Sequence, residues 1–189
     1  MITRPSNKDI LADSLLELLQ TTPIQDISVA VICKNCQMSS RTFYNYFKDK
    51  HEAAAYIYSR MERSCREENG KLLQYRSYVK KWNRVVEENY TRFLVNTLCY
   101  KGQNNIRDVI LESGVDAVVN IMRHNGCKEL SEKDKDVIRF YCVGVDDIIE
   151  RRILSGKTYQ DGNLQASLFY AHTPISIAKY IVGFDEDDG

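Results

Sequence analysis

The chain of 189 residues contains few of the residues that interrupt helices and none of the common catalytic motifs. It has 3 prolines and 9 glycines, and no glycine precedes Gly70, which disfavours architectures rich in glycine turns. No glycine-rich phosphate loop, HExxH or G-x-S-x-G motif occurs, and the 3 histidines, His51, His124 and His172, are far apart in sequence. We therefore expect a protein that is not an enzyme and that carries no cofactor.

Long apolar runs, an export signal and a disulfide framework are also missing. No apolar run approaches the ~20 residues of a membrane span, and the amino terminus MITRPSNKD lacks the apolar core of a signal peptide. The 6 cysteines are scattered along helical patterns, which indicates reduced thiols. These features predict a cytoplasmic protein with no membrane partner.

The net charge is zero, but it is unevenly distributed along the chain. Residues 1–84 hold 14 Lys+Arg against 9 Asp+Glu, whereas residues 85–189 hold 12 against 17. This polarity suits a protein that presents its amino-terminal part to phosphates. Much of the excess lies between Arg60 and Arg84, where a solvated helix face is the alternative explanation.

Helical periodicity extends along the whole chain, and no series of short segments alternates with period two. The predicted fold class is therefore all-α. Apolar stripes and capping signals place helices at about residues 7–20, 28–36, 39–47, 49–65, 78–100, 105–124, 131–156 and 164–182. The last region should break at Thr173-Pro174, and the acidic tail 185–189 should be disordered.

The segment from Ser28 to Glu52 has the pattern of a helix-turn-helix DNA reader. Ser28 can cap one short helix and Ser39 a second, with Phe43 and Phe47 one turn apart on the buried face. Asp49 and Glu52 can form the capping box of the next helix, just as Ser6 and Asp9 can cap the first. The face opposite the two phenylalanines carries hydrogen-bonding side chains: Ser40, Arg41, Thr42, Tyr44, Asn45 and Tyr46.

These residues resemble the TetR family of bacterial transcription regulators. The resemblance rests on LLELL, ISVAVI, MSSRTFYNYF and KDKHE, which together cover about residues 8–58. Within the family the chain is similar to the subgroup that includes regulators of dihydroxyacetone kinase operons. The resemblance implies a three-helix DNA-binding domain at residues 1–49, a helix shared from residue 49, and a larger helical domain for effector binding and dimerisation at residues 50–184.

A recognition helix places its amino-terminal side chains against base edges, while flanking residues hold phosphates. Arg41 is the best candidate for reading a base, because its guanidinium can donate to guanine O6 and N7 together. By position in the family motif, Tyr44 and Lys50 should bind phosphate. The predicted DNA contacts are Ser28, Ser40, Arg41, Thr42, Tyr44, Asn45, Tyr46 and Lys50.

Two departures from the family pattern fall in this segment. Cys33 and Cys36 stand where the family usually has alanine, and cysteine is small and apolar enough to replace it in a core. Gln37-Met38 stands where the family usually has Gly-Val, and a turn residue with positive φ costs a non-glycine side chain free energy. A structural zinc site needs about four ligands, and no second CxxC supplies them, so we predict no metal site.

If the resemblance holds, the second domain binds a small-molecule effector and forms a two-fold dimer. Candidates for the effector pocket are aromatic residues and methionines of the middle helices, which could equally form a plain core: Tyr58, Met61, Trp82, Tyr90, Phe93, Tyr100, Met122 and Tyr141. The last two helical regions are the family's usual dimer elements. Candidate dimer contacts, which could instead belong to the core of the protomer, are Tyr141, Ile148, Ile153, Phe169 and Ile177.

The sequence therefore predicts a homodimeric, ligand-responsive regulator that binds a double-stranded DNA operator, as a repressor rather than an activator. One alternative is an interaction protein or coactivator of the same fold that acts through a protein partner and reads DNA weakly or not at all. A second alternative is a thiol-based redox or metal sensor that uses Cys33 and Cys36.

Overall fold

The computed structural model describes residues 5–68, 71–156, 178, 180 and 181. Within these residues the regular structure is helical, apart from an antiparallel hairpin of β1 (Glu67–Glu68) and β2 (Lys71–Leu72), so the all-α prediction is confirmed. The chain divides into two compact units, Met1–Met61 with Asn89–Val109, and Glu62–Glu88 with Ile110–Gly189. The domain boundary predicted at residue 49 stays a prediction.

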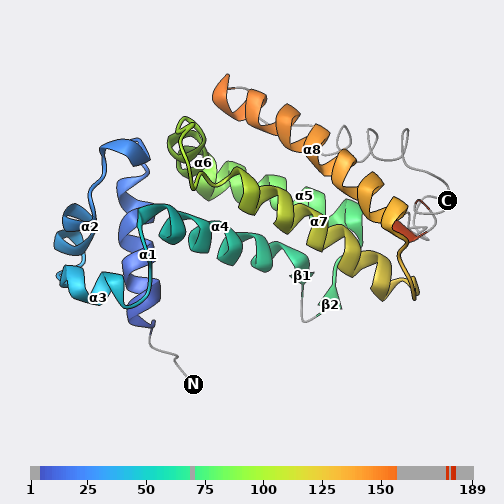
Figure 1. Cartoon of the computed structure of the whole chain (residues 1–189), viewed down its shortest axis with the longest axis horizontal. Helices are drawn as coiled ribbons and strands as arrows, with labels where there is room; N and C mark the ends of the chain where they lie inside the picture. Colours follow the sequence, from blue (N-terminus) through green and yellow to red (C-terminus); the bar gives the residue numbers. More distant parts are fainter. Residues whose placement is uncertain (1–4, 69–70, 157–177, 179, 182–189) are drawn as a thin grey trace. The chain divides into compact units, whose positions relative to one another are not determined.

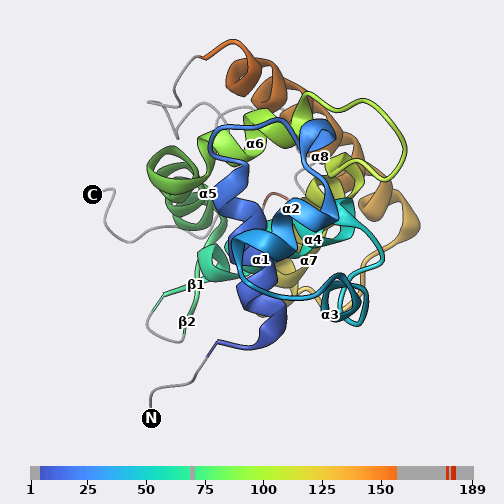
Figure 2. The same ribbon diagram turned by 90° about the vertical axis from the view of Figure 1, so that its left-hand side faces the viewer.

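Short capped helices form most of the first unit (Figures 1 and 2). They are α1 (Asn7–Leu18), η1 (Ile24–Asp26), α2 (Val29–Asn35), α3 (Ser40–Tyr44), the first part of α4 (Lys50–Arg66) and α6 (Thr91–Leu98). The predicted caps are present: Ser6 and Asp9 form a capping box, Ser28 accepts the Val31 N–H at 3.3 Å, and Ser39 accepts the Thr42 N–H at 3.1 Å.

The core of this unit holds α3 by one face only. Phe43 is 0% exposed and Phe47 2% exposed, and the Phe47 ring lies 5.6 Å from the Tyr56 ring of α4. Tyr56 in turn donates to Asp9 Oδ1 of α1 at 2.8 Å. The predicted aromatic pair therefore anchors the second helix of the motif, and the opposite face of α3 remains at the surface. The other buried side chains include Leu11, Leu15, Leu19, Ile24, Ile32, Ile57, Phe93 and Leu94.

The second unit contains the end of α4, the hairpin, α5 (Tyr75–Val85), most of α7 (Arg107–His124) and α8 (Glu132–Leu154). An ion pair lies in its core. The Glu62 carboxylate is 2% exposed and accepts hydrogen bonds from Arg66 Nε at 2.7 Å and from the Tyr78 hydroxyl at 3.1 Å. Arg66 also donates to the Ser113 carbonyl at 3.3 Å, so the pair joins α4 to both α5 and α7.

Three sequence predictions need correction. The segment expected to form a single helix at 78–100 consists of α5, a π-helical turn η2 (Val86–Tyr90) and α6. The sequence suggested one helix because a wider turn rotates the following residues without breaking the apolar pattern. The first helix ends at Leu18 and not near residue 20. Asp49 Oδ1 accepts the N–H groups of His51 and Glu52 at 2.9 Å, but the Glu52 carboxylate accepts the Lys48 N–H, so the predicted capping box is only half correct.

The helical region expected at 164–182 and the tail 185–189 lie outside the described residues, except that Ala178, Tyr180 and Ile181 are helical. In the part of the chain that is described, no helix combines the length and the hydrophobicity of a membrane span.

Candidate nucleic-acid interface

The turn between α2 and α3 has the hydrogen bonds of a Schellman motif. The Met38 N–H donates to the Cys33 carbonyl at 2.8 Å, and the Gln37 N–H donates to the Lys34 carbonyl at 3.3 Å. This geometry puts Gln37 at φ 56°, in the left-handed region that favours glycine. The strain anticipated at Gln37-Met38 is therefore real and falls on Gln37, yet the turn still closes and leads directly into α3.

The outer face of α3 presents the side chains expected of a recognition helix. Ser40, Arg41 and Asn45 are exposed, and the Tyr44 side chain is 59% exposed. Tyr46, two residues beyond the end of α3, is 39% exposed. Thr42 is half-buried, and its hydroxyl shares a 2.9 Å hydrogen bond with the capping hydroxyl of Ser39. Arg41 is thus free to reach outward, whereas Thr42 already has a partner within the helix cap.

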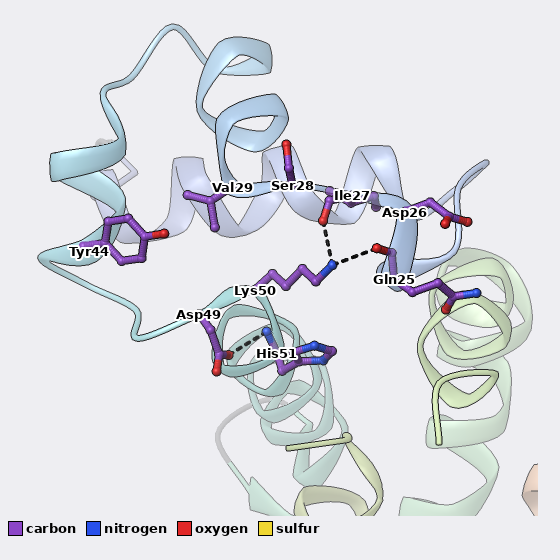
Figure 3. Close-up of a pocket in the computed structure, with 9 residues that line it drawn as sticks. All are labelled: Gln25, Asp26, Ile27, Ser28, Val29, Tyr44, Asp49, Lys50 and His51. Carbon is purple, nitrogen blue, oxygen red and sulfur yellow. Dashed lines mark hydrogen bonds between the residues drawn. The ribbon is translucent and has the colours of Figure 1, made fainter. Parts of the chain in front are cut away.

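The first turn of α4 approaches the connection between α1 and α2 (Figure 3). The Lys50 side chain extends to that connection, where its ammonium donates to the carbonyls of Gln25 at 3.1 Å and Ile27 at 2.7 Å. Burial lowers the pKa of Lys50, while the carboxylates of Asp26 and Asp49 act in the opposite direction. An ammonium has three N–H donors, so Lys50 retains one donor for a further acceptor.

An open pocket of about 350 Å³ lies at this junction. It brings together three of the residues predicted to contact DNA, Ser28, Tyr44 and Lys50, although they lie far apart in sequence. The rest of its lining is Gln25, Asp26, Ile27, Val29, Asp49 and His51. A hydroxyl, a phenol and an ammonium around an open pocket are donors suited to a phosphate oxygen.

Sequence reasoning missed two parts of this site. No sequence signal indicates that Lys50 bonds to backbone carbonyls more than 20 residues away. The sequence assigned His51 no role at this site, but its side chain is half-buried and its ring stacks on Tyr100, with centroids 4.6 Å apart and an interplanar angle of 26°. Burial lowers the pKa of His51, and Lys50 adds to this while Asp49 opposes it.

The cysteines of the CxxC motif lie where packing predicts. Cys33 is 3% exposed, and burial raises the pKa of its thiol. Cys36 is half-buried, and its thiol donates to the Ile32 carbonyl at 3.3 Å. Both are free thiols, and no group of three or more His, Cys, Asp or Glu side chains in the described residues could hold a metal ion.

The predicted effector residues fall in both compact units. Tyr58, Met61, Tyr90, Phe93 and Tyr100 belong to the first, whereas Trp82, Met122 and Tyr141 belong to the second. None of them lines the pocket at α4, and Tyr141 shares a 3.0 Å hydrogen bond with the buried Tyr75. Among the predicted dimer contacts, Ile153 is 5% exposed and Ile148 is half-buried, while Phe169 and Ile177 lie outside the described residues.

A capped α2–turn–α3 motif followed by further helices defines a class of protein: the chain has the fold of the TetR-family transcription regulators. No family model and no curated protein matches the sequence. Solved structures do. The chain is similar to the dihydroxyacetone kinase operon activator DhaS, with 18% identity, a TM-score of 0.63, and coverage of 87% of this chain and 93% of that one.

Two further solved structures show the same likeness. A TetR transcriptional regulator from Rhodococcus sp. RHA1 has 12% identity and a TM-score of 0.60, and the match covers 90% of this chain and 99% of that one. A tetR-family transcriptional regulator from Streptomyces coelicolor has 12% identity and a TM-score of 0.58, with 92% and 79% covered. At these identities the likeness is one of fold.

Proposed function

We propose that this protein is a DNA-binding transcription regulator that uses α3 as its recognition helix. The observation that carries the proposal is the division of α3 into two faces. Phe43 is fully buried, while Arg41 and Tyr44 are exposed on a helix of five residues that adds little to the core. Such a helix suits a role in contacting an external partner, and its donors match base edges and phosphates.

The test compares a base-reading residue with a phosphate-binding one. Arg41→Ala should weaken binding to the DNA next to the protein's own gene by about 1 to 3 kcal/mol and should relax the sequence preference. Lys50→Gln should weaken binding to all duplexes alike and lower the slope of log K against log[salt] by about one. Both effects are measured by fluorescence anisotropy with the promoter duplex and with a mixed-sequence duplex.

A matched control is Lys133→Ala, which removes an exposed cation from α8 in the second unit. It should leave the affinity and the salt slope unchanged. Equal losses for all three variants would indicate a general charge effect. A wild-type protein that binds neither duplex at low salt would contradict the proposal.

We further propose that the regulator acts as a homodimer, so that two recognition helices meet half-sites about 34 to 36 Å apart, or a multiple of that distance. The protomer leaves Phe140 of α8 83% exposed and Val143 50% exposed, and these lie one turn apart on the helix. A homodimer would bury such a surface. Phe140→Asp should shift the protein towards a monomer in analytical ultracentrifugation, and an unchanged dimer would exclude this part of α8 from the interface.

Regulation by a small-molecule effector is the remaining part of the proposal, with binding in the second unit. Asn83 of α5 supports it, because the residue is 5% exposed and neither amide atom has a hydrogen-bond partner among the described residues. Buried amides are nearly always paired, so a ligand atom is one candidate for the missing partner. A thermal-shift screen of metabolites would test it, with Asn83→Leu expected to abolish any shift.

A repressor is the form of regulation that we propose, and an activator working with a protein partner is the second candidate. DhaS, to which the fold is similar, is an operon activator. Deletion of the gene with a reporter fused to the neighbouring promoter separates the two. Expression should rise if the protein represses and fall if it activates.

A further inference from the structure

The connection between α6 and α7, residues 99–106, lies against the first turn of α4 within the first unit. Tyr100 stacks on His51 through ring centroids 4.6 Å apart, and the Asn104 amide lies 3.5 Å from Asp49 Oδ2. These two contacts flank Lys50 in the sequence. The first turn of α4 is therefore held by Lys50 to the α1–α2 connection and by its two neighbours to the α6–α7 connection.

Several local features hold the Tyr100 ring in place. Arg107, the first residue of α7, donates to the Tyr100 carbonyl at 2.9 Å and also to the Leu98 carbonyl. Gly102 lies against the phenol, since a Cβ at that position would be 2.2 Å from the Tyr100 hydroxyl oxygen. Only glycine leaves room for the ring without a shift. Asn104 adopts φ 59°, a conformation that asparagine tolerates better than most residues.

We propose that Tyr100 is a positioning residue for the phosphate-binding end of α4. Its ring fixes His51, which keeps the first turn of α4 at the angle where Lys50 reaches the Gln25 and Ile27 carbonyls and lines the pocket with Ser28 and Tyr44. The inference rests on the proposed DNA-binding function. It gives Tyr100 a role at the DNA-binding face and not in the effector pocket that the sequence suggested.

The test uses Tyr100→Leu, with Tyr100→Phe as the matched control that keeps the ring. Tyr100→Leu should raise the Kd for a mixed-sequence duplex about fivefold and lower the salt slope by about one, as Lys50→Gln does, because one phosphate contact is lost. Tyr100→Phe should behave as wild type. The double variant Tyr100→Leu/Lys50→Gln should bind no more weakly than Lys50→Gln alone, since both changes remove the same contact.

A second measurement reports the contact without DNA. The pKa of His51, followed by the NMR signal of its ring C–H, should rise towards the ordinary value in Tyr100→Leu, because the covering ring is removed. Gly102→Ala, which displaces the phenol, should raise the pKa of His51 and weaken DNA binding, as Tyr100→Leu does.

The two failures are distinguishable. If wild type and Lys50→Gln differ in salt slope but Tyr100→Leu matches wild type, the positioning role is refuted and the DNA-binding proposal stands. Additive losses in the double variant would also refute it. If wild type binds no duplex, the DNA-binding proposal fails and the positioning role fails with it.

Discussion

Replacing Asp146 with Asn is expected to stabilise the protein at neutral and alkaline pH and to change little near pH 4. Asp146 lies on α8, and its Oδ2 atom is buried without a hydrogen-bond partner in the part of the chain that the structure describes. The pKa of Asp146 is raised from 3.8 to about 7. Burial is the larger cause, and the neighbouring Glu150 carboxylate is the smaller one. The native state therefore holds a proton at pH values where the unfolded chain has released it.

The sign of the pH dependence follows from this difference. Between about pH 4 and pH 7 the native state binds more protons than the unfolded state, so the free energy of unfolding falls as the pH rises. Asparagine has no proton to lose and avoids the fall. The gain in free energy of unfolding on Asp146→Asn should therefore grow by about 3 kcal/mol between pH 4.5 and pH 8.

The assay is urea unfolding followed by circular dichroism at pH 4.5, 6 and 8. Asp147→Asn is the control, because it removes the adjacent carboxylate, which is exposed and forms a 2.9 Å ion pair with Arg151. That change should stay below about 1 kcal/mol throughout the pH range. A gain for Asp146→Asn that is the same at pH 4.5 and pH 8 would refute the assignment of a buried, protonated carboxyl.

Three further substitutions address strain and buried polar groups. Gln37→Gly should raise the free energy of unfolding by up to about 1 kcal/mol, because glycine adopts φ 56° without steric cost; a loss on urea titration would contradict the strain at that turn. Asn83→Leu should raise the Tm of the ligand-free protein in calorimetry, since it replaces a buried amide that lacks partners, and a lower Tm would mean that the amide is satisfied. Arg66→Met should lower the free energy of unfolding by about 3 kcal/mol or more, because it leaves the Glu62 carboxylate buried without its ion pair. Adding Glu62→Gln to this variant should restore much of the loss in the same urea assay.

Local signals account for the parts of the fold that the sequence predicted well. Each helix cap predicted at Ser6, Ser28 and Ser39 depends on residues no more than three positions away, and all three caps form. The position of α3, with Phe43 buried, depends only on the same short segment. Helical periodicity also predicted the all-α class, because the fold class does not depend on where each helix ends.

Contacts between distant segments account for what the sequence did not predict. The Lys50 ammonium bonds to carbonyls of the α1–α2 connection, and His51 stacks on a tyrosine 49 positions away in the numbering. No residue type marks a backbone carbonyl as an acceptor for a particular lysine. The π-helical turn at Val86–Tyr90 was missed for a related reason, because one extra residue in a turn leaves the apolar stripe nearly continuous.

The turn before α3 shows why a departure from a family pattern need not remove a function. Gly126 ends α7 with the same two hydrogen bonds, Cys127 N–H to the Met122 carbonyl at 3.0 Å and Gly126 N–H to the Arg123 carbonyl at 3.1 Å. At the end of α2 the corresponding distances are 2.8 and 3.3 Å with Gln37 in the glycine position. The hydrogen bonding of the turn is therefore preserved without glycine, and the expected penalty is about 1 kcal/mol of stability. Since Ser39 still caps α3 directly after this turn, the substitution should affect how stable the motif is and not how Arg41 is presented.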